Sequence, residues 1–256
     1  ILQYWLKIGD EDKGQGYIAS VNKYLERDIK EENLDILTKI GVFCNFAGWY
    51  SRSVSIATSS SKAFESLLGL ENKKTLNNFS FLASALMVNG EYEKALELYN
   101  LVLEGQEKHL GKRHPDTLLT IHDLGKLYHA YEDFEKAEIL YNRCLEADKV
   151  VYGIDHPDTL ITLGSLALLF IDKGNFKKAK SLYNELLKKQ EKILGSNHPN
   201  IGITINNLGR LYHDMEELEK AEKFYRKSIE QDKKLLGSDH PSTLISLGNL
   251  ALLLND

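Results

Sequence analysis

The chain has 256 residues, 43% of them hydrophobic, and a formal net charge of −5 from 32 Lys and Arg against 37 Asp and Glu. The two signs are interspersed without long blocks of like charge, which argues against nucleic-acid binding. No apolar run approaches the ~20 residues that a membrane-spanning helix needs, and no secretory signal opens the chain. Cys44 and Cys144 fall on apolar helix faces. We interpret them as buried, reduced thiols and expect a cytoplasmic protein.

Residues 1–33 lack the pattern that dominates the rest of the chain, and we interpret them as an N-terminal cap or the tail of a preceding domain. Residue 1 is Ile rather than Met, and the last copy of the pattern stops after one helix at Asp256. We therefore expect a segment of a longer protein whose flanking domains connect it to a larger assembly. A final helix without its partner should leave an apolar face open to water, formed by Leu247, Leu250 and Leu254.

A 42-residue register begins near Leu34, is degenerate over residues 34–72, is regular over 73–240 and ends in a half copy at 241–256. In the degenerate copy the second helix contains the run Thr58-Ser59-Ser60-Ser61, where four hydroxyl side chains in a row favour an irregular or frayed stretch.

Each regular copy holds two stripes of apolar residues at spacings of three and four, separated by a tight turn, and from residue 114 on each copy begins with a His-Pro dipeptide. Such stripes each form one face of a helix, and a fixed period of this size indicates a repeat array. We expect the first helices near residues 74–88, 116–130, 158–172, 200–214 and 242–254. We expect the second helices near residues 92–108, 134–150, 176–192 and 218–234.

The residues at the helix ends repeat with the same period. Proline suits the first helical position because its missing N–H costs nothing there, and glycine suits a left-handed stop after a second helix. These positions are Pro115, Pro157, Pro199 and Pro241, and Gly111, Gly153, Gly195 and Gly237. The histidines before the prolines recur with the architecture, so we interpret them as caps or packing residues. Recurring alanines and tyrosines in the second helices, such as Ala137 and Tyr141, indicate close helix packing.

Catalytic and metal-binding patterns are missing from the sequence: there is no Gly-x-Ser-x-Gly, no His-Glu-x-x-His and no Cys-x-x-Cys. His122 and His129 stand two helical turns apart, about 10 Å, too far to share one ion without other ligands. We therefore predict a protein that is not an enzyme and binds no cofactor or metal.

The run Leu124-Gly125-x-x-Tyr128 followed by Ala137 and Tyr141 resembles the tetratricopeptide pattern. Leu-Gly-x-x-His-Pro-Asp-Thr-Leu at a 42-residue spacing resembles the kinesin-light-chain subtype, which is similar to nephrocystin-like arrays and to the arrays of signalling NTPases. The resemblance implies an all-α, right-handed superhelical solenoid that binds short peptide segments in a concave groove lined by the first helices. It makes a protein–protein interaction scaffold the leading hypothesis. The alternative is the sensor or effector-binding array of a signalling NTPase whose catalytic domain lies outside this segment.

A second period, twice as long as the first, is also present. Residues 117–172 agree with 201–256 at 30 of 56 positions, whereas 117–158 agree with 159–200 at only 15 of 42. A recently duplicated two-copy unit explains this, and so do two kinds of copy with different surface contacts.

The groove faces of successive first helices alternate in character. We expect polar and basic residues in one copy, apolar residues in the next and a polar copy again, with Asp172 and Asp214 moderating the positive charge. The predicted groove residues are His122, Lys126 and His129, then Ile161, Leu168 and Ile171, then Ile203, Asn206, Asn207, Arg210 and His213. They predict a peptide ligand that combines acidic with bulky apolar side chains, because Lys126 and Arg210 can pair with carboxylates.

Overall fold

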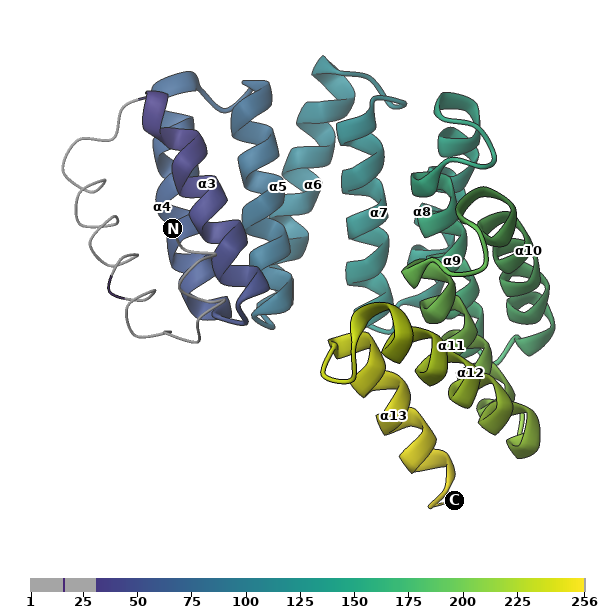
Figure 1. Cartoon of the computed structure of the whole chain (residues 1–256). Helices are drawn as coiled ribbons and strands as arrows, with labels where there is room; N and C mark the ends of the chain where they lie inside the picture. The colour runs from purple at the N-terminus through teal and green to yellow at the C-terminus, as the bar shows by residue number, and fades with distance from the viewer. Residues whose placement is uncertain (1–15, 17–30, 256) are drawn as a thin grey trace. The chain divides into compact units, whose positions relative to one another are not determined.

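The computed structural model describes residue 16 and residues 31–255, so the expectations for the cap at residues 1–33 lie almost entirely outside the described part. That part is all-α, with helices α3 to α13 and no strand (Figure 1). None of the described helices is long and apolar enough to cross a lipid bilayer. The predicted all-α class and the repeated helix pair are confirmed.

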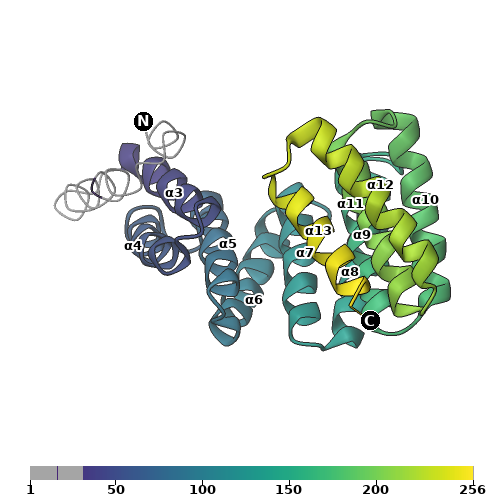
Figure 2. The same ribbon diagram turned by 60° about the horizontal axis from the view of Figure 1, so that its bottom comes forward.

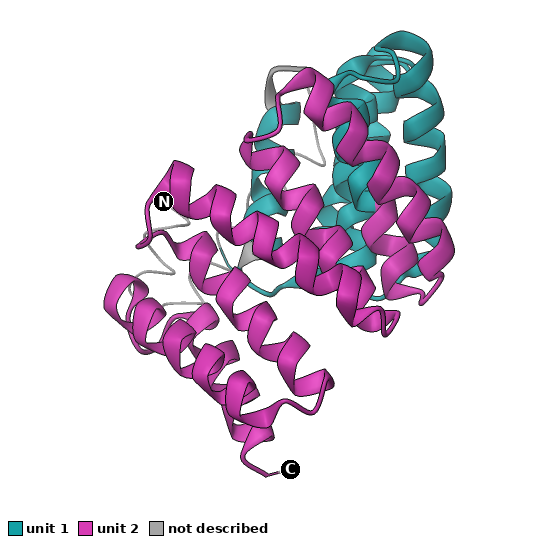
Figure 3. Ribbon diagram, turned by 90° about the vertical axis from the view of Figure 1, so that its right-hand side faces the viewer, with its two compact units in different colours: residues 1–123 teal, residues 124–256 magenta. Residues whose placement is uncertain are grey.

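The chain divides into two compact units, residues 1–123 and 124–256 (Figure 3). Unit 1 holds α3 (Glu31–Phe46), α4 (Tyr50–Leu68), α5 (Lys73–Val88), α6 (Tyr92–His109) and the first half of α7 (Pro115–Ala130). Unit 2 holds the rest of α7, α8 (Phe134–Val151), α9 (Pro157–Asp172), α10 (Phe176–Leu194), α11 (Pro199–Asp214), α12 (Leu218–Leu236) and α13 (Pro241–Leu253).

Within unit 2 the first helices of successive copies contact one another, α9 against α11 and α11 against α13. The second helices α10 and α12 lie on the other side of these first helices (Figure 2). Each second helix also packs on the first helices before and after it. A groove residue on α9 is therefore brought next to its counterpart in the following copy, on α11.

The helix starts agree with the sequence prediction within one residue, and proline with histidine fixes those of α7, α9, α11 and α13. In α9, Pro157 opens the helix and the Nδ1 atom of His156 accepts a hydrogen bond from the backbone N–H of Asp158, at 3.2 Å. The same histidine cap precedes α7, α11 and α13. The interpretation of these histidines as caps is confirmed. The predicted glycine stops are confirmed too: Gly195 has φ 75° and Gly237 has φ 99°, a left-handed backbone that disfavours other residues.

The prediction of an irregular stretch at residues 58–61 is wrong, since α4 runs without a break from Tyr50 to Leu68. The hydroxyl of Thr58 donates to the Val54 carbonyl one turn earlier, at 2.8 Å. The hydroxyl of Ser61 donates to Asn78 Oδ1 on α5, at 2.7 Å. Because partners inside the helix and on its neighbour satisfy these hydroxyls, packing overrides the weak helix propensity of serine and threonine.

The tyrosines of the second helices form the centre of each copy. Tyr99, Tyr141, Tyr183 and Tyr225 are all fully buried. A Cβ atom placed on Gly125 would lie 2.8 Å from Tyr141 Cε1, so the small residue of the first helix leaves the room that the ring occupies. The predicted packing role of the tyrosines is confirmed.

The open end of the final helix is only partly as expected. Leu250 is buried among residues that include Tyr212 and Tyr225 of the preceding pair, whereas Leu254 is 62% exposed. Of the three leucines expected to face water, Leu250 is therefore a core residue and Leu247 packs partly buried against the same core, because α13 turns that face toward α12.

Two buried carboxyl groups occupy the same position in alternate copies but have different surroundings. Asp148 accepts a hydrogen bond from the Thr162 hydroxyl at 2.8 Å. Asp232 is 1% exposed, and its Oδ1 atom has no hydrogen-bond partner within the described residues. Burial raises the pKa of Asp232 above its ordinary value of 3.8, against smaller opposite effects of His240 and a hydrogen bond from Ser228.

Replacing Ala221 by leucine should destabilise the chain, because Ala221 is fully buried at a close contact between helices. Overpacking such a site costs about 1–3 kcal/mol. The matched control is Lys223→Leu, which adds the same side chain at an exposed position of the same helix. Thermal unfolding followed by circular dichroism should show a clear loss for the first variant only, and equal losses would contradict the face assignment.

Asp232→Asn should raise the stability of the chain, compared with the parent, more at neutral pH than at acidic pH. Below pH 3.8 the parent carboxyl is protonated in both states, so its ionisation costs nothing there. As the pH rises through the raised folded pKa, the folded parent must ionise a buried carboxyl and loses stability, whereas the amide does not titrate. The melting-temperature difference between variant and parent should therefore grow from pH 4 to pH 8. The exposed control Asp239→Asn should show little of this growth, and a flat difference for Asp232→Asn would contradict the assignment.

Candidate functional site

Unit 2 contains a pocket of about 460 Å³ between α9, α10 and α11. This volume lies within the range of ~300–1,000 Å³ typical of ligand pockets. Its apolar wall is formed by Ile161, Leu168, Leu186, Ile193, Leu194 and Ile203. The pocket therefore suits a bulky apolar group.

Gly164 has no side chain and so leaves space in the wall of this pocket. Gly164 lines it between Ile161 and Leu168, and a Cβ atom there would lie 3.3 Å from Leu186 Cδ2. The equivalent residue of α11 is Asn206, which is 8% exposed and whose Oδ1 accepts a hydrogen bond from Asn249 Nδ2 at 3.1 Å. The Asn206 side chain therefore fills the space between α11 and α13. The corresponding space between α9 and α11, beside Gly164, is left open.

Polar atoms at the pocket wall come mainly from α10 and α11. The Tyr183 hydroxyl is buried and makes no well-aligned hydrogen bond within the described residues, although the Asn207 side chain lies close to it. Burial raises the pKa of Tyr183 above its ordinary value of 10.0, the Arg210 guanidinium lowers it and the Asp172 carboxylate raises it. Gln190 Oε1, by contrast, accepts a hydrogen bond from the Thr204 hydroxyl at 2.7 Å.

Asp172, the last residue of α9, connects three consecutive first helices. Its Oδ2 atom lies 2.7 Å from His129 Nε2 at the end of α7, and its Oδ1 atom accepts a hydrogen bond from Arg210 Nη2 on α11. Arg210 Nε lies a further 3.7 Å from Asp214 Oδ2. Burial raises the pKa of Asp214, and the nearby positive charge of Arg210 offsets part of that rise.

The other end of the pocket is also charged. Asp155 Oδ1 lies 2.8 Å from Lys189 Nζ, and this hydrogen-bonded pair lowers the pKa of Asp155. Both ends of the apolar wall are thus marked by ion pairs internal to unit 2.

The structure brings together some of the predicted groove residues and separates others. Ile161, Leu168, Ile203 and Asn207 line the pocket. His129 and Arg210 meet at Asp172, while Lys126 is exposed and His213 is half-buried, both outside the pocket lining.

Two predicted groove residues have packing roles instead. Ile171 is 3% exposed and belongs to the core of unit 2, although Leu168 on the turn before it lines the pocket. Asn206 is buried against Asn249. His122 is half-buried, with its Nδ1 atom 3.8 Å from Asp123 Oδ1, and lies in unit 1.

The sequence prediction missed the contribution of α10. Tyr183, Leu186 and Gln190 line the pocket but lie on a second helix, where the recurring tyrosine was interpreted only as core. The signal that could have revealed them is the glycine at position 164, since a gap in a first helix exposes the second helix behind it.

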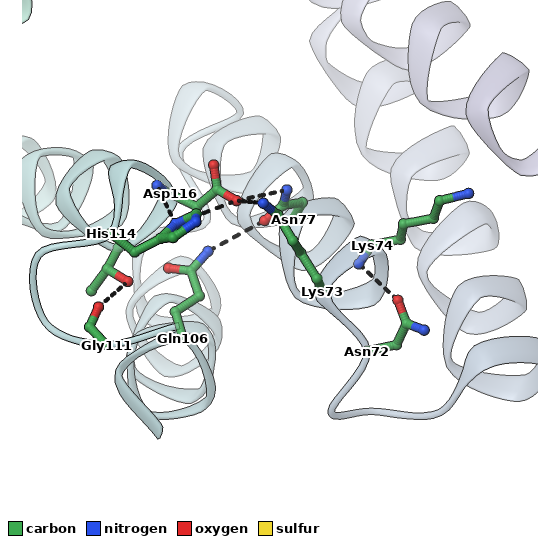
Figure 4. A network of polar contacts seen from close by, with 9 residues as sticks. Asn72, Lys73, Lys74, Asn77, Gln106, Gly111, His114 and Asp116 are labelled. Atoms are coloured by element: carbon green, nitrogen blue, oxygen red, sulfur yellow. Dashed lines mark hydrogen bonds and ion pairs between the residues drawn. The ribbon is translucent and has the colours of Figure 1, made fainter. Parts of the chain in front are cut away.

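In unit 1 the region that corresponds to the pocket lies two copies earlier in the chain, between α5, α6 and α7. Its residues are polar instead of apolar. Asn77 stands in place of Ile161 and donates through Nδ2 to Asp116 Oδ2, at 3.3 Å (Figure 4). Lys73 Nζ lies 3.1 Å from the same carboxylate oxygen, and Gln106 Nε2 donates to Asn77 Oδ1 at 3.4 Å. Asn77 and Ile161 stand 84 residues apart, so copies that the longer sequence period makes equivalent still differ in chemistry at the level of the pocket.

The regular copies match a known family of repeats. A family model described as tetratricopeptide repeat matches residues 74–149, 132–192, 158–234 and 200–255. No curated protein sequence matches the chain.

Several solved structures are similar in fold. A structure described as a kinesin light chain of Podosopora anserina with nearly identical TPR-like repeats is 22% identical, with a TM-score of 0.67 over 82% of this chain and 99% of that one. BtubC (BKLC) from P. vanneervenii is 21% identical, with a TM-score of 0.66 over 80% and 83%. The apo form of the quorum sensor NprR from B. thuringiensis is 19% identical, with a TM-score of 0.66 over 99% and 66%. The resemblance to kinesin-light-chain-type repeats is confirmed at the level of the fold.

Proposed function

Because the chain belongs to the tetratricopeptide repeat family, we propose that it is a non-catalytic interaction scaffold that binds a peptide segment of a partner protein along the first helices of unit 2. The observation that carries the proposal is the apolar pocket opened by Gly164 between α9 and α11. A pocket of this kind accepts one anchor side chain of a peptide whose backbone follows the groove.

The surface beside the pocket supports an apolar anchor. Ile161, Ile203 and Ile245 occupy the same position in three successive first helices and are 53%, 51% and 59% exposed. Large aliphatic side chains left open to water at one repeated position provide apolar area that a ligand can cover. The ligand therefore contributes bulky apolar side chains, spaced to meet successive first helices.

The acidic part of the predicted ligand has weaker support. Of the basic groove residues, His129 and Arg210 already contact Asp172, and Lys126 lies exposed outside the pocket lining. The bulky apolar anchor is thus the primary feature of the proposed peptide, and carboxylates would add less.

A sensing role for the same groove is the second candidate. Its support is the likeness in fold to the quorum sensor NprR, which extends over 99% of this chain. In that case the peptide would be an effector rather than a segment of a stable partner, and the pocket would hold the same kind of anchor.

The test is a display selection of peptides on the purified chain, followed by binding to Gly164→Leu. We expect the selected peptides to carry a bulky apolar residue, and the variant to bind them at least about tenfold more weakly, because losing a buried anchor costs ~2 kcal/mol or more. Leucine has a higher helix propensity than glycine, which offsets the close approach of its Cβ atom to Leu186 Cδ2 at 3.3 Å.

Gly248→Leu is the matched control, since Gly248 is the equivalent glycine of α13 and a Cβ atom there meets nothing within 4 Å. It should bind the selected peptides as the parent does, with both melting temperatures measured alongside. Undiminished binding by Gly164→Leu would refute the pocket as the anchor site.

A further inference from the structure

We infer that Asp172 sets the charge preference of the proposed peptide site: by holding His129 and Arg210, it prevents them from recruiting carboxylates and so selects ligands that are neutral beside their apolar anchor. The inference rests on the proposed function, and it assigns a specificity-determining role to a residue outside the pocket lining.

The position of Asp172 makes this role specific to the pocket. Asp172 lies one helical turn beyond Leu168 on α9, and Arg210 lies three residues beyond Asn207 on α11, so each continues a stripe that lines the pocket. The buried Tyr183 phenol at the pocket wall lies close enough to both charges for each to shift its pKa. A peptide anchored in the pocket would therefore pass directly beside this ion pair.

Both oxygens of the carboxylate are in use. Oδ2 contacts His129 Nε2 at 2.7 Å and Oδ1 accepts from Arg210 Nη2. The side chains of Asp172 and His129 are 23% and 15% exposed, whereas that of Arg210 is 41% exposed, so water screens the carboxylate and the imidazole less than the guanidinium. The His129 ring is also fixed by edge-on contacts with Phe134 and Tyr141, at centroid distances of 5.8 and 6.4 Å.

A ligand carboxylate gains little at such a cluster. Asp172 and Arg210 cancel in formal charge, so an approaching carboxylate meets no net attraction from the pair. To bind Arg210 it would have to displace Asp172, which would then be left with a partly buried, less well paired charge. The same guanidinium without Asp172 would be a favourable carboxylate site, because its planar donors suit two oxygens.

Substitution of Asp214 is the control that separates the effect of Asp172 from the effect of net charge. It also faces Arg210, but at 3.7 Å, four residues away on the same helix, and its side chain is 37% exposed. Exposed pairs of this kind are weak. Asp172→Asn and Asp214→Asn therefore change the net charge equally. Only Asp172→Asn removes the carboxylate that contacts both Arg210 and His129.

The experiment uses an apolar peptide selected on the parent chain and a second form with two glutamates placed beside the anchor. Dissociation constants are measured by fluorescence anisotropy at low and high salt. We expect Asp172→Asn to bind the glutamate form about tenfold more tightly than the parent does, an effect reduced by salt, with the neutral form changed by less than about twofold. Asp214→Asn should shift the glutamate form by no more than about threefold.

A second variant keeps the inference testable if Asp172→Asn lowers the melting temperature. The double variant Asp172→Asn with Arg210→Gln removes both charges of the pair. It should bind the glutamate form nearly as the parent does, because in the parent the two charges already cancel. A loss of tenfold or more would show that Arg210 recruits ligand carboxylates directly, which overturns the inference.

The outcomes separate the inference from the proposed function. If the neutral peptide binds through the Gly164 pocket but Asp172→Asn and Asp214→Asn shift the glutamate form equally, the inference is overturned and the proposed function stands. If no selected peptide binds the parent, the proposed function is overturned, and the inference with it.

Discussion

The packing of one tyrosine ring against one small residue underlies the fold of every regular copy. The tyrosine of each second helix is fully buried, and glycine or alanine on the first helix leaves the space for its ring. At Gly209 an added Cβ atom would lie 2.6 Å from the Tyr225 ring, so the two helices approach as closely as the ring allows. The same contact occurs between Gly125 and the Tyr141 ring, and it turns one face of each of these two first helices toward its second helix.

Helix positions could be predicted from the sequence because their determinants are local. Pro157 with the His156 cap defines the start of α9, and the positive φ of Gly195 ends α10, so each boundary depends on a few adjacent residues. Prediction was wrong where partners come from elsewhere in the fold, as at Ser61, whose hydroxyl is satisfied by Asn78 of the next helix. The sequence also gave no sign that Glu132 and Glu216, at the same turn in alternate copies, adopt φ near 60° where other copies have glycine.

The site was harder to predict than the fold because a groove depends on what is missing as much as on what is present. The apolar character of Ile161, Leu168 and Ile203 could be recognised from the helical period. The depth of the pocket comes instead from Gly164, and its rear wall comes from Tyr183 of a second helix. Periodicity also placed Ile171 on the open face with Leu168, whereas the structure buries it in the core of unit 2.

The charges of the groove also depend on which side chains are paired and not only on how many are present. Counting side chains along the first helices suggests a basic groove, because Lys126, His129 and Arg210 fall on nearby faces. The structure places Asp172 between two of them, so their charges act within the protein first and on a ligand second. In unit 1 the equivalent level holds Asn77, Asp116 and Lys73, which satisfy one another in the same manner (Figure 4). Where polar groups of such an array are internally paired, ligand affinity depends mainly on the apolar positions that remain unfilled, and in unit 2 these surround Gly164.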